Sequence, residues 1–187
     1  MLFVPPTDTP WTTTVDSALT AIQQFWLTKP HALTDGLRQL GKLKLVVLAE
    51  HSEILSTDEQ WMLPKSATTI WCREIRMYLE DQAIVSARSL CSIEASEQAW
   101  ASIRSLGNRP LADVLYADPE VQRSSFCFLS AITRQPSLNA LCATELSESE
   151  LQATWARSSQ FLRHDQALTV TECFHPAFWQ NFARLLP

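Results

Sequence analysis

Glycine is scarce in this sequence, and its scarcity argues against several familiar kinds of site. Only 3 of the 187 residues are glycine, which leaves little room for a glycine-rich loop that wraps a phosphate group with its backbone amides. The G-x-S-x-G pattern that presents a serine nucleophile in many hydrolases is also absent. These absences argue against a phosphate-binding loop and against a serine hydrolase.

Cysteine and histidine are present but do not form a metal-binding pattern. The 5 cysteines are odd in number, lie far apart and include no C-x-x-C pair, and the 4 histidines show no ligand spacing. Scattered thiols that stay reduced are typical of a cytoplasmic protein. We therefore expect a cytoplasmic location, no disulfide framework and no metal ion.

A long apolar run and an excess of positive charge are missing as well. No apolar stretch reaches the ~18 residues of a membrane span, and the N-terminus lacks the basic start of a signal peptide. The net charge of -5 argues against a nucleic-acid partner, because a phosphate-binding surface is normally basic. With 46% hydrophobic residues, the chain suits one globular domain, residues 1–187, without membrane insertion.

The spacing of apolar residues predicts a mixed α+β domain. Apolar residues three and four apart indicate helices, and branched or alternating apolar residues indicate strands. We expect helices at residues 15–26, 34–40, 94–106 and 110–115, and strands at residues 42–50, 71–80, 84–93, 124–132, 158–163 and 167–174. Residues 134–150 indicate a loop with a short helix, and residues 164–165 a turn. This order of elements favours an antiparallel sheet over parallel βαβ units.

Two of the expected strands carry a charged residue on an apolar face. Side chains alternate along a strand, so Arg73 faces the same side as Trp71 and Ile75. By the same period, Glu172 faces the same side as Val170 and Phe174, on the last strand. Burying either charge without a partner costs several kcal/mol. Each of the two charged side chains therefore needs a partner.

Two explanations of these inward charges remain open at this stage. In the first, Arg73 and Glu172 are structural and pair with each other or with other buried polar groups. In the second, they line a closed pocket, where Arg73 holds a ligand carboxylate and Glu172 is a hydrogen-bond partner or proton donor at the far end. Arg88 lies on a mixed face, and a solvent-facing position fits it equally well. Cys72 and Cys173 alternate onto the opposite faces, as small buried apolar side chains.

Six segments in a fixed order carry a family resemblance. They are ALTDGLRQLGK (32–42), LPKSATTIWCREI (63–75), SARSL (86–90), SLGNRPLADVLY (105–116), WARSSQF (155–161) and LTVTECFHP (168–176). The patterns W-x-R-E-I, G-x-x-P-L and T-E-x-F-x-P within them are the most specific as a set. By these segments, which span most of the chain, the sequence resembles the chorismate lyase (chorismate–pyruvate lyase) family. Members of this family convert chorismate to 4-hydroxybenzoate and pyruvate, at the entry to ubiquinone synthesis.

The resemblance implies both a fold and a set of site residues. The implied fold is a single α+β domain with a six-stranded antiparallel sheet, helices packed around it and a buried, closed ligand cavity. By position, Arg73 is the arginine that binds the substrate carboxylate, and Glu172 is the glutamate near the ring hydroxyl. Leu33 and Leu111 are substrate contacts made largely through the main chain. Arg88 matches a residue near the route into the pocket and would gate access to it.

The resemblance also implies partners and leaves one alternative open. The expected substrate is chorismate and the expected product 4-hydroxybenzoate, with no cofactor, because the elimination makes an aromatic ring and is strongly downhill. A monomer is expected. The alternative is a non-catalytic module of the same fold that binds an aromatic carboxylate, since this fold resembles the effector domains of some bacterial transcription regulators. His175 lies on the face opposite Glu172, and we expect it to have no catalytic role.

Overall fold

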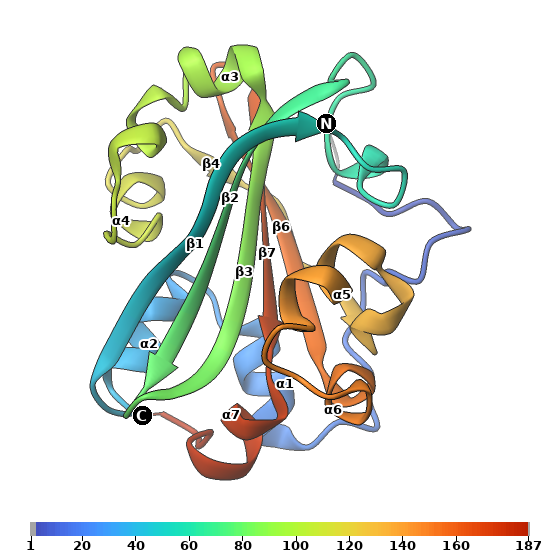
Figure 1. Cartoon of the computed structure of the whole chain (residues 1–187), viewed down its shortest axis with the longest axis vertical. Coiled ribbons are helices and arrows are strands. Elements are labelled where there is room, and N and C mark those ends of the chain that lie inside the picture. The colour runs from blue at the N-terminus through green and yellow to red at the C-terminus, as the bar shows by residue number, and fades with distance from the viewer. Residues whose placement is uncertain (1–2, 187) are drawn as a thin grey trace.

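One antiparallel sheet forms the centre of the molecule (Figure 1). The structure, a computed structural model, describes residues 3–186. The strands lie in the order β1-β2-β3-β7-β6-β4, and β5 also pairs with β6. Their bounds are β1 Leu43–Ile54, β2 Thr69–Leu79, β3 Gln82–Ser92, β4 Gln122–Arg123, β5 Cys127–Ser130, β6 Trp155–Arg163 and β7 Gln166–Phe174. Every pairing is antiparallel, so the expected α+β class is confirmed.

The expected number of strands is wrong. Within residues 3–186 the sheet has seven strands and not six, because the strand expected at 124–132 is observed as β5 and the short strand β4 comes just before it. Ser124 separates β4 from β5: its Oγ accepts the amide hydrogen of Gln160 at 3.0 Å, where a ladder carbonyl would otherwise accept. Pairing with β6 then resumes at Cys127. One edge of β6 is therefore covered by two short strands in succession.

Two expected helices also differ from those observed. The helix expected from residue 15 begins at Ala21, because Thr20 and Gln23 form a reciprocal cap that fixes the first turn. The helix expected over 94–106 is split into α3 (Ile93–Glu97) and a 3₁₀ turn, η2 (Ala101–Ser105). Between the two, the amide of Ala99 donates to the side chain of Gln166 and not to a helical carbonyl.

Both long hairpins close through two residues with left-handed backbone. Glu80 and Asp81, with φ of 46° and 67°, join β2 to β3, and His164 and Asp165, with φ of 49° and 60°, join β6 to β7. Such turns match the right-handed twist of the strands that they connect. The turn expected at residues 164–165 is confirmed.

Short helices cover both faces of the sheet. Figure 1 shows α5 and α6 in front of the sheet and α1 and α2 behind it. No helix within residues 3–186 is long and apolar enough to cross a membrane. The remaining bounds are α1 Ala21–Thr28, α2 Leu33–Arg38, α4 Ala112–Leu115, α5 Pro136–Cys142, α6 Glu148–Ala153 and α7 Pro176–Asn181, with 3₁₀ turns η1 Gln60–Met62 and η3 Ile132–Arg134.

Alternation along the strands divides the core between the two faces. Met77 and Phe174 pack with Trp26 on the α1–α2 side, whereas Cys72 and Cys173 are buried on the α5–α6 side. The interpretation of these two cysteines as small buried apolar side chains is therefore confirmed. The sheet buries both of its faces, as a two-layered apolar core requires.

Residues 134–150 contain more helix than the expected loop with one short helix. They contain α5 and the start of α6, and the intervening turn is fixed by Arg76 on β2. Its guanidinium donates to the carbonyl of Leu141 (3.0 Å), to Oγ1 of Thr144 (2.9 Å) and to the carboxylate of Glu145 (2.8 Å). Since Leu141 is itself buried, this segment forms part of the core on its face of the sheet.

Candidate functional site

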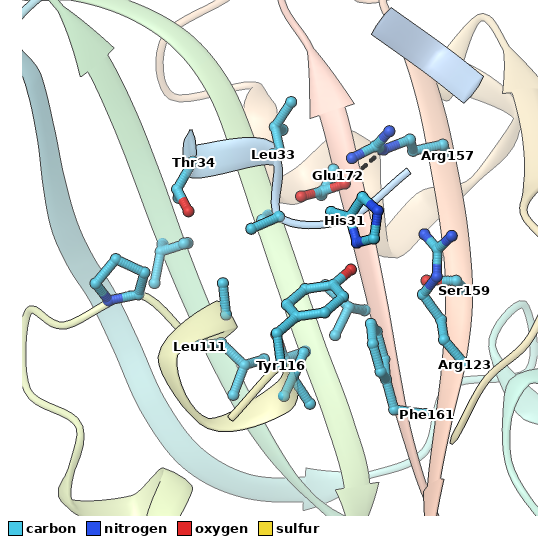
Figure 2. Close-up of a pocket in the computed structure, with 18 of the residues that line it drawn as sticks. His31, Leu33, Thr34, Leu111, Tyr116, Arg123, Arg157, Ser159, Phe161 and Glu172 are labelled. Atoms are coloured by element: carbon cyan, nitrogen blue, oxygen red, sulfur yellow. Dashed lines mark hydrogen bonds and ion pairs between the residues drawn. The ribbon is translucent and has the colours of Figure 1, made fainter. Parts of the chain in front are cut away.

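A cavity lies between the sheet and helices α2 and α4, on the face away from α5 and α6 (Figure 2). Its empty space, with open solvent at its mouth included, is about 570 Å³. Two of its lining residues, His31 and Tyr116, are exposed, so the cavity is not closed from solvent as the family resemblance implied. The lining is mainly apolar and includes Leu45, Met77, Leu115, Phe161 and Val170.

The floor of the cavity is made by residues that face each other across neighbouring strands. In one row, Ile75, Ala87, Glu172 and Arg157 are paired in turn across β2, β3, β7 and β6. All four of them line the cavity. Since paired residues share a face of the sheet, the register explains why one polar pair, Glu172 and Arg157, stands at one end of an otherwise apolar row.

Glu172 is held by Arg157 and not by Arg73. Nε of Arg157 donates to Oε2 of Glu172 at 2.6 Å, and Figure 2 shows this ion pair at the wall of the cavity. Arg157 is 1% exposed. Its Nη1 donates to the carbonyls of Trp26 and Lys29, both at 3.0 Å. Arg157 therefore joins the carboxylate to the C-terminal end of α1.

Arg73 lies in the next row of the sheet, on the same face as the cavity. It is paired with Ser89, and Ser89 with Val170, both of which line the cavity. The guanidinium of Arg73 is 2% exposed and does not itself line the cavity. Its Nη2 donates to the carbonyl of Gly107 at 2.7 Å and to that of Arg109 at 3.3 Å. It lies directly behind the segment that leads to the cavity wall at Pro110 and Leu111.

One donor atom of Arg73 is left without a hydrogen bond. Nη1 is 3.4 Å from Oε1 of Glu50, close enough for an ion pair, but it makes no hydrogen bond within the described residues. Burial lowers the pKa of Arg73 from its usual value, and the charge of Glu50 opposes that change. A second anion near Nη1 would satisfy a buried donor and stabilise the charged form of Arg73.

The main-chain contacts expected at Leu33 and Leu111 fall on the cavity wall. Leu33 is the first residue of α2 and Leu111 precedes α4, so their amides have no acceptor within their own helices. Thr34, beside Leu33, is 6% exposed, and its hydroxyl lines the cavity without a hydrogen-bond partner within residues 3–186. The structure thus brings Leu33, Leu111 and Glu172 together around one space.

Arg88 lies on the other face of the sheet. It forms ion pairs with Glu59 (2.7 Å), Glu74 (2.6 Å) and Glu53, and it is 5% exposed. None of these residues lines the cavity. His175 also faces that side, where its ring meets the hydroxyl of Ser86 at 2.9 Å. Arg88 is therefore neither solvent-facing nor in contact with the site.

Several lining residues were not expected from the sequence. Arg157 precedes the strand expected at 158–163, although it alternates with Ser159 and Phe161 and so shares their face. Arg123 lies on β4, a two-residue strand with too little pattern to recognise. Tyr116 follows α4, and its partial burial raises its pKa, helped by the charge of Glu172 and opposed by Arg123 and Arg157.

No group of three or more His, Cys, Asp or Glu side chains in the described part of the chain is placed to hold a metal ion. The polar groups of the cavity lining are two arginines, one histidine, several hydroxyls, main-chain amides and one carboxylate. These groups suit an organic anion with a hydroxyl group at its far end.

The fold is similar to that of two solved structures. The effector domain of PhnF from Mycobacterium smegmatis is 7% identical, with a TM-score of 0.52 over 78% of this chain and 89% of that one. A GntR-family transcriptional regulator from Bacillus cereus is 5% identical, with a TM-score of 0.51 over 79% of this chain and 100% of that one. At such identities the likeness shows the fold alone: a single α+β domain with an antiparallel sheet.

Sequence comparison identifies the family of this chain, which the fold alone does not. The family model for chorismate lyase matches residues 6–183. "Probable chorismate pyruvate-lyase" of Bordetella avium (strain 197N) is 42% identical over 91% of this chain and 85% of that protein. The protein of the same name from Bordetella pertussis is 40% identical over 90% of each chain. The chain belongs to the chorismate lyase family, and so to the carbon–oxygen lyases. The non-catalytic alternative is not favoured.

Proposed function

We propose that this protein eliminates pyruvate from chorismate and forms 4-hydroxybenzoate. The observation that carries the proposal is one apolar cavity with the Glu172–Arg157 pair at one end and the amides of Leu33 and Leu111 on its wall. A flat ring with a carboxylate opposite a hydroxyl fits that arrangement of donors and acceptors. Family membership and the names of the relatives support the same reaction.

The ring carboxylate would bind at the α2–α4 end of the cavity. The amides of Leu33 and Leu111 are available there, and Arg73 lies behind the Gly107–Arg109 segment with Nη1 unbonded. A substrate carboxylate would supply the acceptor that Nη1 lacks, in a charge-assisted hydrogen bond. Arg73 is thus proposed as the substrate-carboxylate residue, with Glu50 as its partner in the free protein.

Glu172 would bind the hydroxyl on C4 of the substrate ring. In its ion pair with Arg157 the carboxylate offers only acceptors, which favours a hydrogen-bond acceptor over a proton donor. In the reaction the bond from C3 to the ether oxygen breaks, C4 loses its hydrogen as a proton, and the ring becomes aromatic. The leaving enolpyruvate takes up a proton to become pyruvate. A carboxylate next to C4 is placed to orient the hydroxyl and to favour loss of the neighbouring proton.

The protein's contribution is then orientation and electrostatics. The apolar lining excludes water from most of the ring, and the fixed donors hold the substrate in one pose. No step requires a cofactor, because the gain in aromaticity drives the elimination. Arg88 has no contact with the cavity, so we assign it no part in the mechanism.

Turnover of chorismate by the purified protein tests the proposal. We expect equal amounts of 4-hydroxybenzoate, followed by its absorbance, and pyruvate, followed by a coupled dehydrogenase. Denatured protein is the control for spontaneous decay of chorismate. Binding of 4-hydroxybenzoate without turnover would contradict the proposal and restore the non-catalytic alternative.

We further propose that the product enters ubiquinone synthesis and that the protein acts as a cytoplasmic monomer. The family resemblance supports all three statements. Loss of ubiquinone in a deletion strain, restored by added 4-hydroxybenzoate, would test the role in ubiquinone synthesis. Light scattering after gel filtration would test the monomer, and a mass other than 21.1 kDa would contradict it. Cell fractionation would test the cytoplasmic location.

A further inference from the structure

Arg123 is an arginine of the cavity whose charge the protein does not neutralise. It lines the cavity and is half-buried, and no ion pair or hydrogen bond of its side chain occurs within residues 3–186. Its guanidinium carbon lies 4.2 Å from the ring centroid of Phe126, so the group is oriented by stacking. The cation is positioned, but its donors are available to a ligand.

The other arginine of the lining is not available in this way. Arg157 donates to Glu172 and to carbonyls at the end of α1. Its guanidinium carbon lies 4.4 Å from the same Phe126 ring, which therefore contacts both cations. With Arg157 balanced by Glu172, this end of the cavity keeps one positive charge, that of Arg123.

The position of Arg123 matches the second carboxylate of chorismate. Chorismate carries one carboxylate on the ring and another on the enolpyruvyl group, which is attached to C3, next to the hydroxyl-bearing C4. If Glu172 holds the C4 hydroxyl, the C3 group must lie at the same end. Figure 2 shows Arg123 and Glu172 towards β6 and β7, and Thr34 and Leu111 on the other side of the cavity. Arg123 is paired with Phe161, a lining residue of β6.

We propose that Arg123 binds the carboxylate of the enolpyruvyl group and is a specificity-determining residue of the site. This inference rests on the proposed function and extends it to the leaving group. The product 4-hydroxybenzoate has no second carboxylate, so Arg123 favours substrate over product. When the C3–O bond breaks, the negative charge that develops on the enolpyruvyl oxygen lies near the same cation.

The test compares affinities for substrate and product in Arg123→Gln. We expect KM for chorismate to rise about 10-fold or more, because the variant loses a partly exposed, charge-assisted hydrogen bond to the substrate. The dissociation constant for 4-hydroxybenzoate should change less than about 2-fold, because the product does not reach Arg123. Arg123→Lys keeps the charge and should recover part of the affinity for chorismate. Arg38→Gln, an exposed arginine on α2 outside the cavity, is the matched control for loss of one positive charge.

The outcomes separate this inference from the proposed function. Equal losses of affinity for chorismate and for 4-hydroxybenzoate in Arg123→Gln would show that the residue only shapes the cavity, and would overturn the inference. An unchanged KM would overturn it as well. If the wild-type protein binds chorismate without turnover, the proposed reaction is wrong, and dissociation constants from calorimetry still decide the role of Arg123. Absence of chorismate binding in the wild type would overturn both.

Discussion

The two faces of the sheet bury arginines in different ways. On the α5–α6 face, Arg88 has three carboxylate partners, and Arg76 donates to a carbonyl, a hydroxyl and a carboxylate. On the cavity face, Arg73 has an unbonded Nη1 and Arg123 makes no ion pair within the described residues. Arg73 and Arg123 thus keep donors without a partner, whereas Arg157, the third arginine of the cavity face, is bonded to Glu172.

We propose that this difference separates structural charges from charges that bind a ligand. A buried cation with all its donors bonded has no capacity for another anion. A buried donor without an acceptor costs free energy in the free protein, and an anion that binds this donor recovers that free energy. Inward orientation alone does not distinguish the two cases, because Arg73 and Arg88 are both buried.

The largest expected effect is on stability, from Arg88→Ala. The substitution leaves three carboxylates facing one another in a buried site, and we expect the free energy of unfolding to fall by about 3–5 kcal/mol. Urea denaturation measures the change. Arg104→Ala, which removes an exposed arginine paired with Glu97, should cost less than about 1 kcal/mol. A folded, stable Arg88→Ala variant without activity would contradict the structural assignment and support a role in access.

Arg73→Ala should reduce kcat/KM for chorismate on the order of 100- to 1,000-fold, because the ring carboxylate loses its buried partner. Steady-state kinetics measures this, with circular dichroism to show that the fold is kept. Arg73→Lys retains a charge and should lose less. Glu50→Gln removes the partner outside the cavity and should retain most of the activity. Near-normal rates in a folded Arg73→Ala variant would place Arg73 with the structural arginines of the opposite face.

Glu172→Gln should lower kcat about 10- to 100-fold, the cost of one charged hydrogen bond. Its effect on the dissociation constant of 4-hydroxybenzoate should be smaller, because a neutral amide still accepts from the hydroxyl. The comparison of kcat with product affinity is the measurement. A weakened product affinity with unchanged kcat would make Glu172 a binding residue only.

Gly107→Ala tests the segment that Arg73 holds. Gly107 has φ of +54°, and nothing lies within 4 Å of a Cβ added there, so the cost is backbone strain of about 1 kcal/mol. Thermal or urea unfolding measures it. Gly107→Asn is the matched variant, because asparagine adopts this conformation more readily and should cost less. Equal losses in the two variants would contradict the explanation by strain.

The smallest expected effect is a pH dependence of stability that arises from Glu53, on the α5–α6 face. Burial alone would raise the pKa of Glu53, but hydrogen bonds and charges from Arg88 and His51 hold it below its ordinary value of 4.5. A carboxylate with a lowered pKa stabilises the fold above that ordinary value, and the contribution is lost as the pH falls through the lowered one. Urea denaturation at pH 7 and at pH values below 4.5 should show this loss in the wild type. Glu53→Gln should show less of it, and an equal loss in both proteins would assign it to other groups.

The inward direction of Arg73 and Glu172 could be predicted from alternation, but their partners could not. The bulge between Val47 and Ala49 shifts the register of β1 by one residue. Without it, Glu50 would oppose Cys72 on the other face, and with it Glu50 opposes Arg73. The sequence of a short apolar strand does not show where a bulge lies. The ion pair between Arg73 and Glu50 could therefore not be predicted.

The remaining differences arise from contacts between distant parts of the chain. The break between β4 and β5 involves Ser124 and Gln160, which are 36 residues apart. The partner of Glu172 was missed because Arg157 stands just outside the strand expected from periodicity. The resemblance to a family assigned Leu33 and Leu111, whose side chains carry no chemical signal. Their main-chain role stays a prediction that structures with ligand would test.

Arg157 also links the end of α1 to the cavity. The same guanidinium that contacts Glu172 also holds the carbonyls of Trp26 and Lys29, and the chain that leaves Lys29 runs to the cavity wall at Leu33. The start of this stretch is therefore anchored through Arg157 to Glu172, the one carboxylate among the described residues that line the cavity. An occupant that competes with Arg157 for Glu172 should loosen the stretch, and amide hydrogen exchange of residues 31–33 with and without 4-hydroxybenzoate would test this.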